Sequence, residues 1–347
     1  TYSHPLEEFY QKITGYSMSI DSEPHRIDSY DVDELNYSVF PWDLDMRQMS
    51  PGQLHAQIDF VQLNGMLLNH EHWSQSISAV GATPANYLAL AGCCTERAVK
   101  YNGVAIDSQH IMYGFDAAET EFVTPVDSDH WVILVPKDLI IGHLGEESAA
   151  DLLRNKLFLE CASRQSRQLM TLVDRGLGKL PGGRKEHVDS QTRAAIQWEL
   201  LDIITEILLL NDMSGKQSTP RKRYLACRKA LIHAMKLSTL IQVPELAAVA
   251  GVSQRVLELG FQETLGMSPQ KFLRWNRMNK LHRDLRNART ASYKVTDICN
   301  RWGFHELGRT AVEYKRLFGE SPSATLRREI QPHRIRLVDA LSETTNR

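Results

Sequence analysis

Long apolar runs and a paired cysteine pattern are both missing from this sequence. The longest apolar runs, residues 131–136 and 207–210, are far shorter than the ~18 residues of a membrane span, so we expect no membrane partner. The N-terminal residues are acidic and polar where a signal peptide would be basic and then apolar. The cysteines are odd in number and lack the spacing of a disulfide framework or a metal site: Cys93, Cys94, Cys161, Cys227 and Cys299. These absences favour a protein of the reducing cytoplasm with inert, buried thiols.

Charge is almost balanced over the whole chain, at −2, but it is distributed unequally along the sequence. Residues 216–347 contain 25 Lys and Arg against 11 Asp and Glu, a net charge of +14. Residues 1–215 contain 15 against 31, a net charge of −16. A region as basic as residues 216–347 attracts polyanions with salt-sensitive affinity. We therefore predict that the C-terminal part binds nucleic acid and that the acidic part stays away from it.

The residue pattern changes twice along the chain. Short β-like runs separated by turn residues lie between about residues 44 and 136 and favour an antiparallel sandwich or small barrel. Helical periodicity follows, and a polar segment precedes the basic part. We predict an α+β multidomain protein: a β-rich sensing domain at 1–145, a helical dimerisation segment at 146–210, a linker at 211–220, a tandem helix-turn-helix domain at 221–330 and a tail at 331–347.

Residues 190–210 are expected to form a long helix with a broad apolar face. Its apolar residues include Ile196, Leu200, Ile203 and Ile207. Two interpretations remain open, because this face could pack against the β-rich domain or against a second subunit. The dimerisation prediction assigns these four side chains to a homodimer interface.

Two similar helical units occupy the last third of the chain. The first runs from Val243 to Phe261 and is followed by Gly266-Met-Ser-Pro269; the second runs from Val295 to Tyr314 and is followed by Gly319-Glu-Ser-Pro322. Each has a short first helix, a glycine at the turn and a second helix with apolar anchors. In such pairs the second helix lies in the DNA major groove. We predict that one chain reads two successive major grooves of double-stranded DNA.

The second unit carries a longer motif, which reads Thr296-Asp297-Ile298-Cys299, Gly303-Phe304, Tyr314-Lys315-Arg316-Leu317-Phe318-Gly319-Glu320-Ser321-Pro322 and Leu326-Arg327. With these residues, the region from about 221 to 330 resembles the DNA-binding domain of AraC/XylS-type bacterial transcription regulators. The segment His305-Glu306-Leu307-Gly308, followed by Tyr314, resembles the subgroup that contains regulators of ethanolamine utilisation more than it resembles the arabinose group.

The resemblance implies a sequence-specific transcription regulator, of the activator kind, that is neither an enzyme nor a cofactor-dependent protein. It also implies a cupin-like N-terminal barrel that binds a small effector, helices that pair the subunits, and RNA polymerase as a further partner. Four residues depart from the family pattern in the two recognition helices: Leu259, Gly260, Gly308 and Val312. The family's usual base contacts therefore do not carry over to these positions.

Helical spacing of the apolar anchors leaves one face of each recognition helix free for DNA. The predicted base-contacting residues are Gln254, Arg255, Glu258, Leu307, Gly308 and Arg309. The predicted phosphate-contacting residues are Lys294, Arg301, Lys315 and Arg316. For Arg255 and Arg309, contact with phosphates or acidic neighbours is the alternative to base readout.

Two alternatives concern the N-terminal part. The segment Leu90–Thr95, with Cys93 and Cys94, resembles the turn that presents a nucleophilic cysteine in amidotransferase-like sensor domains. Separately, His70 and His72 alternate along a strand, so both could bind one metal ion together with His55, His110 or His130. The primary prediction includes neither a catalytic residue nor a metal ligand.

Overall fold

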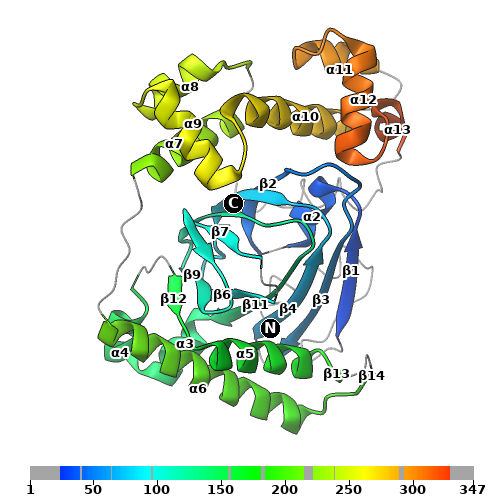
Figure 1. Cartoon of the computed structure of the whole chain (residues 1–347). Helices are drawn as coiled ribbons and strands as arrows, with labels where there is room; N and C mark the ends of the chain where they lie inside the picture. Colours follow the sequence, from blue (N-terminus) through cyan, green and yellow to red (C-terminus); the bar gives the residue numbers. More distant parts are fainter. Residues whose placement is uncertain are drawn as a thin grey trace, which may run out of the picture.

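The computed structural model describes residues 24–328, apart from residues 40, 64, 95–96, 155–157, 181–183, 215–221, 238 and 289–292. The predicted tail at 331–347 and most of the predicted linker at 211–220 lie outside the described residues. The first half of the chain builds β-sheets with helices packed beneath them, and the last third forms a layer of helices above the sheets (Figure 1).

Two antiparallel sheets form the β-rich domain. Their strands are β1 (His25–Ser29), β2 (Asp43–Gln48), β3 (Ala56–Leu63), β4 (Met66–Trp73), β5 (Ile77–Ala82), β6 (Tyr87–Cys93), β7 (Val99–Tyr101), β8 (Val104–Ile106), β9 (His110–Phe115), β10 (Glu119–Val123), β11 (Ser128–Pro136) and β12 (Phe158–Glu160). The seven-stranded sheet has the order β1-β3-β4-β11-β6-β9-β12, and the five-stranded sheet has the order β2-β5-β10-β7-β8. The predicted β-rich N-terminal region is confirmed.

Side-chain alternation gives the seven-stranded sheet two different faces. On β4, Met66 and Leu68 point into the core formed with the helices, whereas Leu67 and Trp73 point toward the five-stranded sheet. Because residues two apart share a face, His70 continues the helix-facing side. This face of the sheet is the location of a polar cluster described below.

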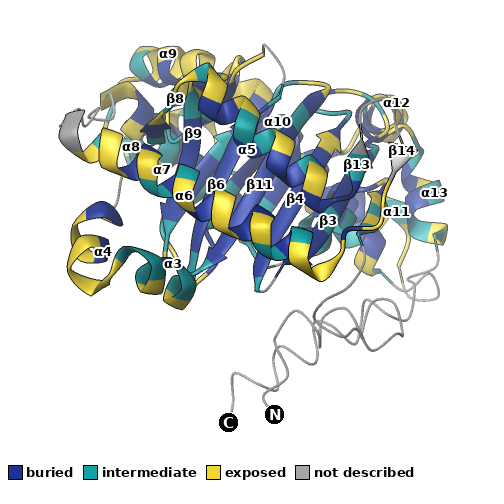
Figure 2. Ribbon diagram, turned by 90° about the horizontal axis from the view of Figure 1, so that it is seen from below, coloured by how far each residue is buried: buried dark blue, intermediate teal, exposed yellow. Residues whose placement is uncertain are grey.

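Among the residues described in the N-terminal part of the chain, five helices are present, and a short hairpin lies between the last two. They are α2 (Val32–Ser38), α3 (Lys137–Leu144), α4 (Glu146–Leu152), α5 (Ser163–Gly176) and α6 (Ser190–Ser214), with the hairpin strands β13 (Lys179–Leu180) and β14 (Arg184–Lys185). Helices α5 and α6 lie across the seven-stranded sheet with exposed outer surfaces (Figure 2). No helix among the described residues is both long and apolar enough to cross a membrane.

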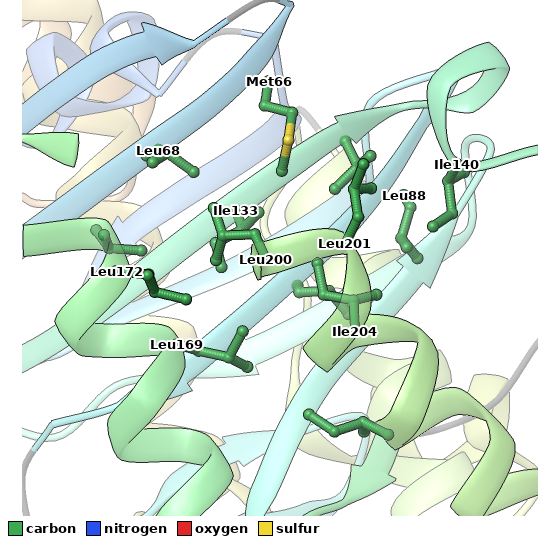
Figure 3. Close-up of a cluster of buried hydrophobic side chains, with 14 of the residues drawn as sticks. Met66, Leu68, Leu88, Ile133, Ile140, Leu169, Leu172, Leu200, Leu201 and Ile204 are labelled. Atoms are coloured by element: carbon green, nitrogen blue, oxygen red, sulfur yellow. The ribbon is translucent and has the colours of Figure 1, made fainter. Parts of the chain in front are cut away.

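The apolar face of α6 packs against the sheet of the same chain. Leu200, Leu201 and Ile204 from α6 meet Leu169 and Leu172 from α5 over the strands (Figure 3). Four residues were predicted at a homodimer interface. Ile196, Leu200 and Ile207 are buried here, and Ile203 is partly buried. These side chains are thus occupied within the subunit, and burial of each aliphatic group contributes roughly 1.5–3 kcal/mol to that packing.

The predicted helical segment at 146–210 contains the β13–β14 hairpin and, before it, one strand of the seven-stranded sheet. Helix α4 ends at Leu152, and β12 joins the edge of the seven-stranded sheet, where Leu159 pairs with Ile111 of β9. Leu159 is buried and its neighbours Phe158 and Glu160 are not, which is the alternation of an edge strand rather than a helical stripe. Sheet pairing over these three residues therefore outweighs their helical periodicity.

The last third of the chain is helical, with bounds close to those predicted. Its helices are α7 (Lys222–Lys236), α8 (Val243–Ala250), α9 (Gln254–Leu265), α10 (Pro269–Asn287), α11 (Val295–Arg301), α12 (Leu307–Phe318) and α13 (Pro322–Arg327). Helix α10 lies between the two groups, with α7, α8 and α9 at one end and α11, α12 and α13 at the other (Figure 1).

Gly260 lies at a tight contact between α9 and α7. A methyl group on its Cα would lie 2.8 Å from the carbonyl oxygen of Arg223 and 3.4 Å from the Cβ of Cys227. Glycine within a helix costs about 1 kcal/mol relative to alanine. The departure from the family pattern at this position therefore has a packing reason, because only hydrogen fits between the two helices.

We predict that Gly260→Ala destabilises the protein, although alanine is the better helix former. Overpacking costs about 1–3 kcal/mol, so the net loss after the gain in helix propensity is up to about 2 kcal/mol. The matched control is Gly308→Ala on α12, where the added methyl group meets no described atom within 4 Å. Urea denaturation measures both variants, and a Gly260→Ala variant as stable as the Gly308→Ala variant would contradict the packing argument.

Candidate nucleic-acid interface

The two helix-turn-helix units share the same turn geometry. Gly251 between α8 and α9, and Gly303 between α11 and α12, both have φ of 72°, the left-handed conformation that glycine adopts without strain. Each unit then closes on a second glycine, Gly266 or Gly319, which is also left-handed and ends the recognition helix. The glycines at the predicted turns are therefore required by the backbone.

The serine of each Gly-x-Ser-Pro motif begins the next helix. Ser268 accepts a hydrogen bond from the backbone N–H of Lys271 at 3.2 Å, and Ser321 accepts one from Ala324 at 3.2 Å. The proline that follows is the first helical residue in both cases. The Gly-x-Ser-Pro motif thus combines the C-cap of one helix with the N-cap of the next, with a single residue between them.

Recognition helix α9 presents a polar face to solvent. Leu257 and Phe261 are buried in the domain core. All three predicted base-contacting residues of this helix are exposed, namely Gln254, Arg255 and Glu258. The side chain of Arg255 makes no hydrogen bond or ion pair with any other residue that the structure describes, so its guanidinium is available for a bidentate contact with a guanine.

Recognition helix α12 has the same two-sided character. Thr310 and Tyr314 are buried, and the three predicted base-contacting residues are exposed: Leu307, Gly308 and Arg309. The side chain of Arg309 is 68% exposed and lies between Glu306 and Glu313, at 3.7 and 3.3 Å. Because exposed pairs within one helix contribute only about 0.3–0.5 kcal/mol, they restrain Arg309 weakly.

The four predicted phosphate-contacting residues are also on the surface, as the sequence led us to expect: Lys294, Arg301, Lys315 and Arg316. Arg301 donates to Asp284 at 3.1 Å. The backbone carbonyl of Arg316 accepts from the N–H of Gly52 at 2.9 Å, so a loop of the β-rich domain lies against the end of α12. Among these four residues, Arg316 is thus the one directly beside the N-terminal domain.

The β-rich domain is docked on α10 through acidic side chains, which sequence reasoning did not anticipate. Arg283 donates to Asp33 at 3.0 Å and to Asp45 at 2.9 Å, and Arg286 donates to Glu34 at 3.2 Å. The charge asymmetry along the sequence is therefore partly neutralised inside the molecule. The only sequence signal of this contact was the opposite sign of the two halves.

Edge strand β2 also bonds to α10. The side-chain amide of Asn279 accepts from the backbone N–H of Gln48 at 2.9 Å and donates to its carbonyl at 3.1 Å, as a neighbouring strand would. Buried Arg47 donates to Asn276 at 3.3 Å. These bonds satisfy backbone groups at an edge of the five-stranded sheet and fix the position of α10 relative to the β-rich domain.

His282 lies at the centre of this contact, completely enclosed. Its Nε2 is 2.7 Å from the carboxylate of Asp31, and its Nδ1 is 2.5 Å from the hydroxyl of Tyr314 on α12. Burial by itself lowers the pKa of His282, but the charge and hydrogen bond of Asp31 outweigh burial, so the pKa is raised. Burial favours the neutral form of Asp31, yet His282 and Arg286 hold its pKa well below the usual range.

We predict that Asp31→Asn weakens the docking of the two domains by about 3–5 kcal/mol, because it leaves a buried imidazolium without its charged partner. Scanning calorimetry should then show a separate transition, or a lower one, for the domain that contains α10. The matched control is Asp28→Asn, which removes an exposed carboxylate 2.9 Å from His55 and should change stability by less than about 1 kcal/mol. Equal effects of the two substitutions would contradict the prediction.

The same pair gives the wild-type protein a pH dependence with a defined sign. The raised pKa of His282 stabilises docking fully below its unfolded value, and this contribution is lost as pH rises through the folded pKa. The lowered pKa of Asp31 stabilises docking above its unfolded value, and this contribution is lost as pH falls through the folded pKa. Both contributions are complete between about pH 4 and 6.5.

A cavity of about 50 Å³ lies between the two sheets of the β-rich domain. This exceeds the ~10–15 Å³ that one water molecule needs. Most of its lining is apolar, including Met46, Ala91 and Phe122. Two lining residues, Trp73 and Tyr113, have buried polar atoms, Nε1 and the hydroxyl, that find no hydrogen-bond partner among the described residues.

The cysteines of the amidotransferase-like alternative do not have the environment of a nucleophile. Burial raises the pKa of Cys93 to about 11 and also raises that of Cys94. His70 contacts Cys94, but the hydrogen bonds that its ring nitrogens donate to Asp129 and Asp174 raise the pKa of this histidine to about 11. A histidine held as an imidazolium cannot accept the thiol proton, so the arrangement does not favour nucleophilic catalysis.

Comparison with known proteins places a helix-turn-helix domain at residues 246–328. A probable thc operon regulatory protein of Rhodococcus erythropolis is 34% identical over 168 residues, which cover 46% of this chain and 51% of that protein. The XylDLEGF operon transcriptional activator 2 of Pseudomonas putida is 31% identical over 100 residues, covering 29% of this chain and 61% of that protein. The chain thus spans about half the length of the first relative.

Among solved structures, the AraC-like transcriptional activator CuxR is similar with a TM-score of 0.40 and 10% identity, over 75% of this chain and 96% of CuxR. The predicted helix-turn-helix region is confirmed by the domain match, and the two sequence relatives are named as an operon regulatory protein and a transcriptional activator. The helix-turn-helix domain match and the identity with the two sequence relatives support the resemblance to the DNA-binding domain of AraC/XylS-type regulators.

Proposed function

We propose that this chain is a sequence-specific, DNA-binding activator of transcription. The observation that carries the proposal is the pair of recognition helices, α9 and α12, each anchored by buried aromatic residues and each with a free polar face. The identity with an operon regulatory protein and with a transcriptional activator supports the same function. In this proposal RNA polymerase is the further partner that activation requires.

The two helices divide the reading of DNA between them. Arg255 on α9 contacts a guanine and Glu258 accepts from a cytosine, while Arg309 on α12 contacts a base in the next major groove and Leu307 packs on a thymine methyl group. Gly308 presents no side chain, which allows the backbone of α12 to approach the bases closely. Lys294, Arg301, Lys315 and Arg316 position the domain on phosphates.

The first experiment is the selection of genomic fragments by the full-length chain at near-physiological salt, followed by footprinting. A recurring site with two protected segments about one helical turn apart, ~10 base pairs, supports the proposal. Recovery that is independent of sequence and disappears at modest salt would refute sequence-specific regulation, because the basic domain would then be a nonspecific anchor.

We predict that Arg309→Ala relaxes sequence preference at a single base step and costs about 1–3 kcal/mol on the best site. The side chain of Arg309 is exposed, so its removal should leave stability unchanged within about 0.5 kcal/mol. Binding to a series of single-base variants of the selected site measures the effect.

Lys315→Ala is the control for Arg309→Ala, because both residues are exposed on α12. It should weaken binding equally on all sequences and reduce the salt dependence by about one phosphate contact. If Arg309→Ala behaved in the same uniform way, Arg309 would be a phosphate contact and not a base reader.

We also propose that a small molecule controls the regulator by binding in the cavity of a cupin-like barrel. The apolar lining, together with the unpartnered polar atoms of Trp73 and Tyr113, suits a small and mainly apolar compound with one hydrogen-bonding group. The likeness to regulators of ethanolamine utilisation stays a prediction, so ethanolamine is tested beside aromatic compounds such as indole and phenol. Control requires that the ligand bind two arrangements of the protein with different affinity.

We predict that Ala91→Leu fills this cavity and removes the ligand response while retaining DNA binding. A ligand that binds the folded wild type at 100 times its Kd adds about 2.7 kcal/mol of stability. This stabilisation appears as a rise in Tm that the variant should lack. An undiminished rise in the variant would place the ligand elsewhere, and no rise with any of the three compounds would exclude them as effectors.

We propose that two copies of the chain act together on DNA. Since the apolar residues first assigned to pairing are buried, the outward face of α6 is the better candidate surface. It exposes Trp198, Leu209 and Leu210 at 60, 47 and 52%. The footprint tests this proposal as well. A single chain should protect one site of two successive major grooves, and a pair of chains should protect two sites of that kind.

A further inference from the structure

A second cluster of reactive side chains lies on the helix-facing side of the seven-stranded sheet. It joins the histidine of the metal alternative to the cysteine of the amidotransferase-like alternative. His70 lies on β4, Asp129 on β11 and Cys94 directly after β6, which are three adjacent strands. The backbone N–H of Cys94 donates to the carbonyl of Asp129 at 2.8 Å, which fixes the two residues side by side.

The three side chains converge within a small volume. The Nε2 of His70 is 2.8 Å from Oδ1 of Asp129, and the potential ligand atoms of His70, Cys94 and Asp129 all lie within 4.8 Å of one another. In a tetrahedral zinc site, bonds of about 2.0–2.3 Å place the ligand atoms roughly 3.3–3.8 Å apart. Small side-chain rotations are therefore enough to bring the three atoms around one ion.

The other nitrogen of His70 already has the partner that a metal-bound histidine requires. Its Nδ1 is 2.8 Å from Oδ1 of Asp174 on α5. Metal-ligating histidines almost always place their second ring nitrogen on a carboxylate, carbonyl or water, which orients the ring. Lys179 also approaches Nδ1, at 2.9 Å, and its charge is matched by Asp59 at 2.9 Å and by Asp174 at 3.8 Å.

We propose that His70, Cys94 and Asp129 form a site for one Zn²⁺ ion, with Asp174 as the residue that positions His70. Thiolate, imidazole and carboxylate together suit zinc better than a hard cation such as Mg²⁺ or Ca²⁺. Water completes the tetrahedron, and His72, exposed and paired across the strands with Asp129, lies on the same face. The site is part of the N-terminal domain and does not depend on the proposed DNA binding.

The charge of the cluster allows protons to be exchanged for a zinc ion. Zinc uptake displaces one proton from Nε2 of His70 and one from the thiol of Cys94, and these two positive charges are replaced by the two of Zn²⁺. The cluster therefore keeps its net charge, the Nδ1–H of His70 still donates to Asp174 on α5, and the ion pairs of Lys179 with Asp59 and Asp174 stay intact. The structure also brings together Asp31, Asp33 and His282. A metal ion there would have to displace existing ion pairs, because Arg286 already pairs with Asp31 and Arg283 with Asp33.

The competing interpretation is an ion-pair network without a metal. In that case the protonated His70 joins Asp129 to Asp174 and fastens α5 to the sheet. Partial burial is compatible with both interpretations, since the side chain of His70 is 18% exposed and that of Asp129 is 35% exposed. Cys94 distinguishes the two interpretations, because the ion-pair network does not use its thiol and the proposed three-ligand site does.

The test is metal binding by the full-length chain, with Zn²⁺ in competition with a chromogenic chelator and with Co²⁺ as a spectroscopic probe. We expect one Zn²⁺ per chain, a rise in the Tm of the N-terminal domain, and a near-ultraviolet sulfur-to-cobalt charge-transfer band. Cys94→Ser should abolish the band. Asp174→Asn retains all three ligands and should weaken zinc binding by about 10–100-fold.

Cys161→Ser is the matched control, since Cys161 is also a half-buried free thiol but lies outside the cluster. It should leave the band and the zinc affinity unchanged. If Cys94→Ser does not fold, cysteine alkylation of the wild type with and without zinc serves as the test instead. Bound zinc should selectively protect the thiol of Cys94 from alkylation. Absence of zinc binding, binding without the cobalt band, or binding that survives in Cys94→Ser would each overturn the proposal in favour of the ion-pair network.

Discussion

The buried contact between His282 and Asp31 is the interaction on which the arrangement of the two domains depends. The histidine is on α10, the helix that joins the two helix-turn-helix units, and the aspartate begins α2 of the β-rich domain. Because the imidazole also contacts Tyr314 of α12, one side chain connects the β-rich domain, the connecting helix and the second recognition helix. Surrounding ion pairs enclose it and keep water away from the charges, which strengthens them.

This contact gives the basic residues of the chain two different uses. Arg283 and Arg286 face acidic groups of the β-rich domain, whereas Arg255 and Arg309 remain on the outer faces of the recognition helices. The strong positive charge of the C-terminal part is therefore not all available to DNA. A rearrangement of the docked domains would change both the orientation of the recognition helices and the number of free cations.

Packing in the rest of the molecule shows how close contacts override local preferences. Gly260 is a poor helix former that is retained where α9 touches α7, and residues 158–160 leave a helical pattern to join a sheet edge. The apolar face of α6 had two interpretations in the sequence, and the sheet beneath it decided between them for Ile196, Leu200 and Ile207. Each outcome depends on a neighbour far away in the chain, which periodicity does not reveal.

Local signals were sufficient for the helix-turn-helix units, because their turns, caps and anchors lie within a few residues of one another. The sequence by itself determined the positions of Gly251 and Gly303, the buried Leu257 and Tyr314 and the exposed faces of α9 and α12. Only the tertiary structure decided the docking of α10, the burial of α6 and the meeting of His70 with Cys94. These features join residues on separate strands and helices, and a sequence pattern records the period of each element but not the distance between two of them.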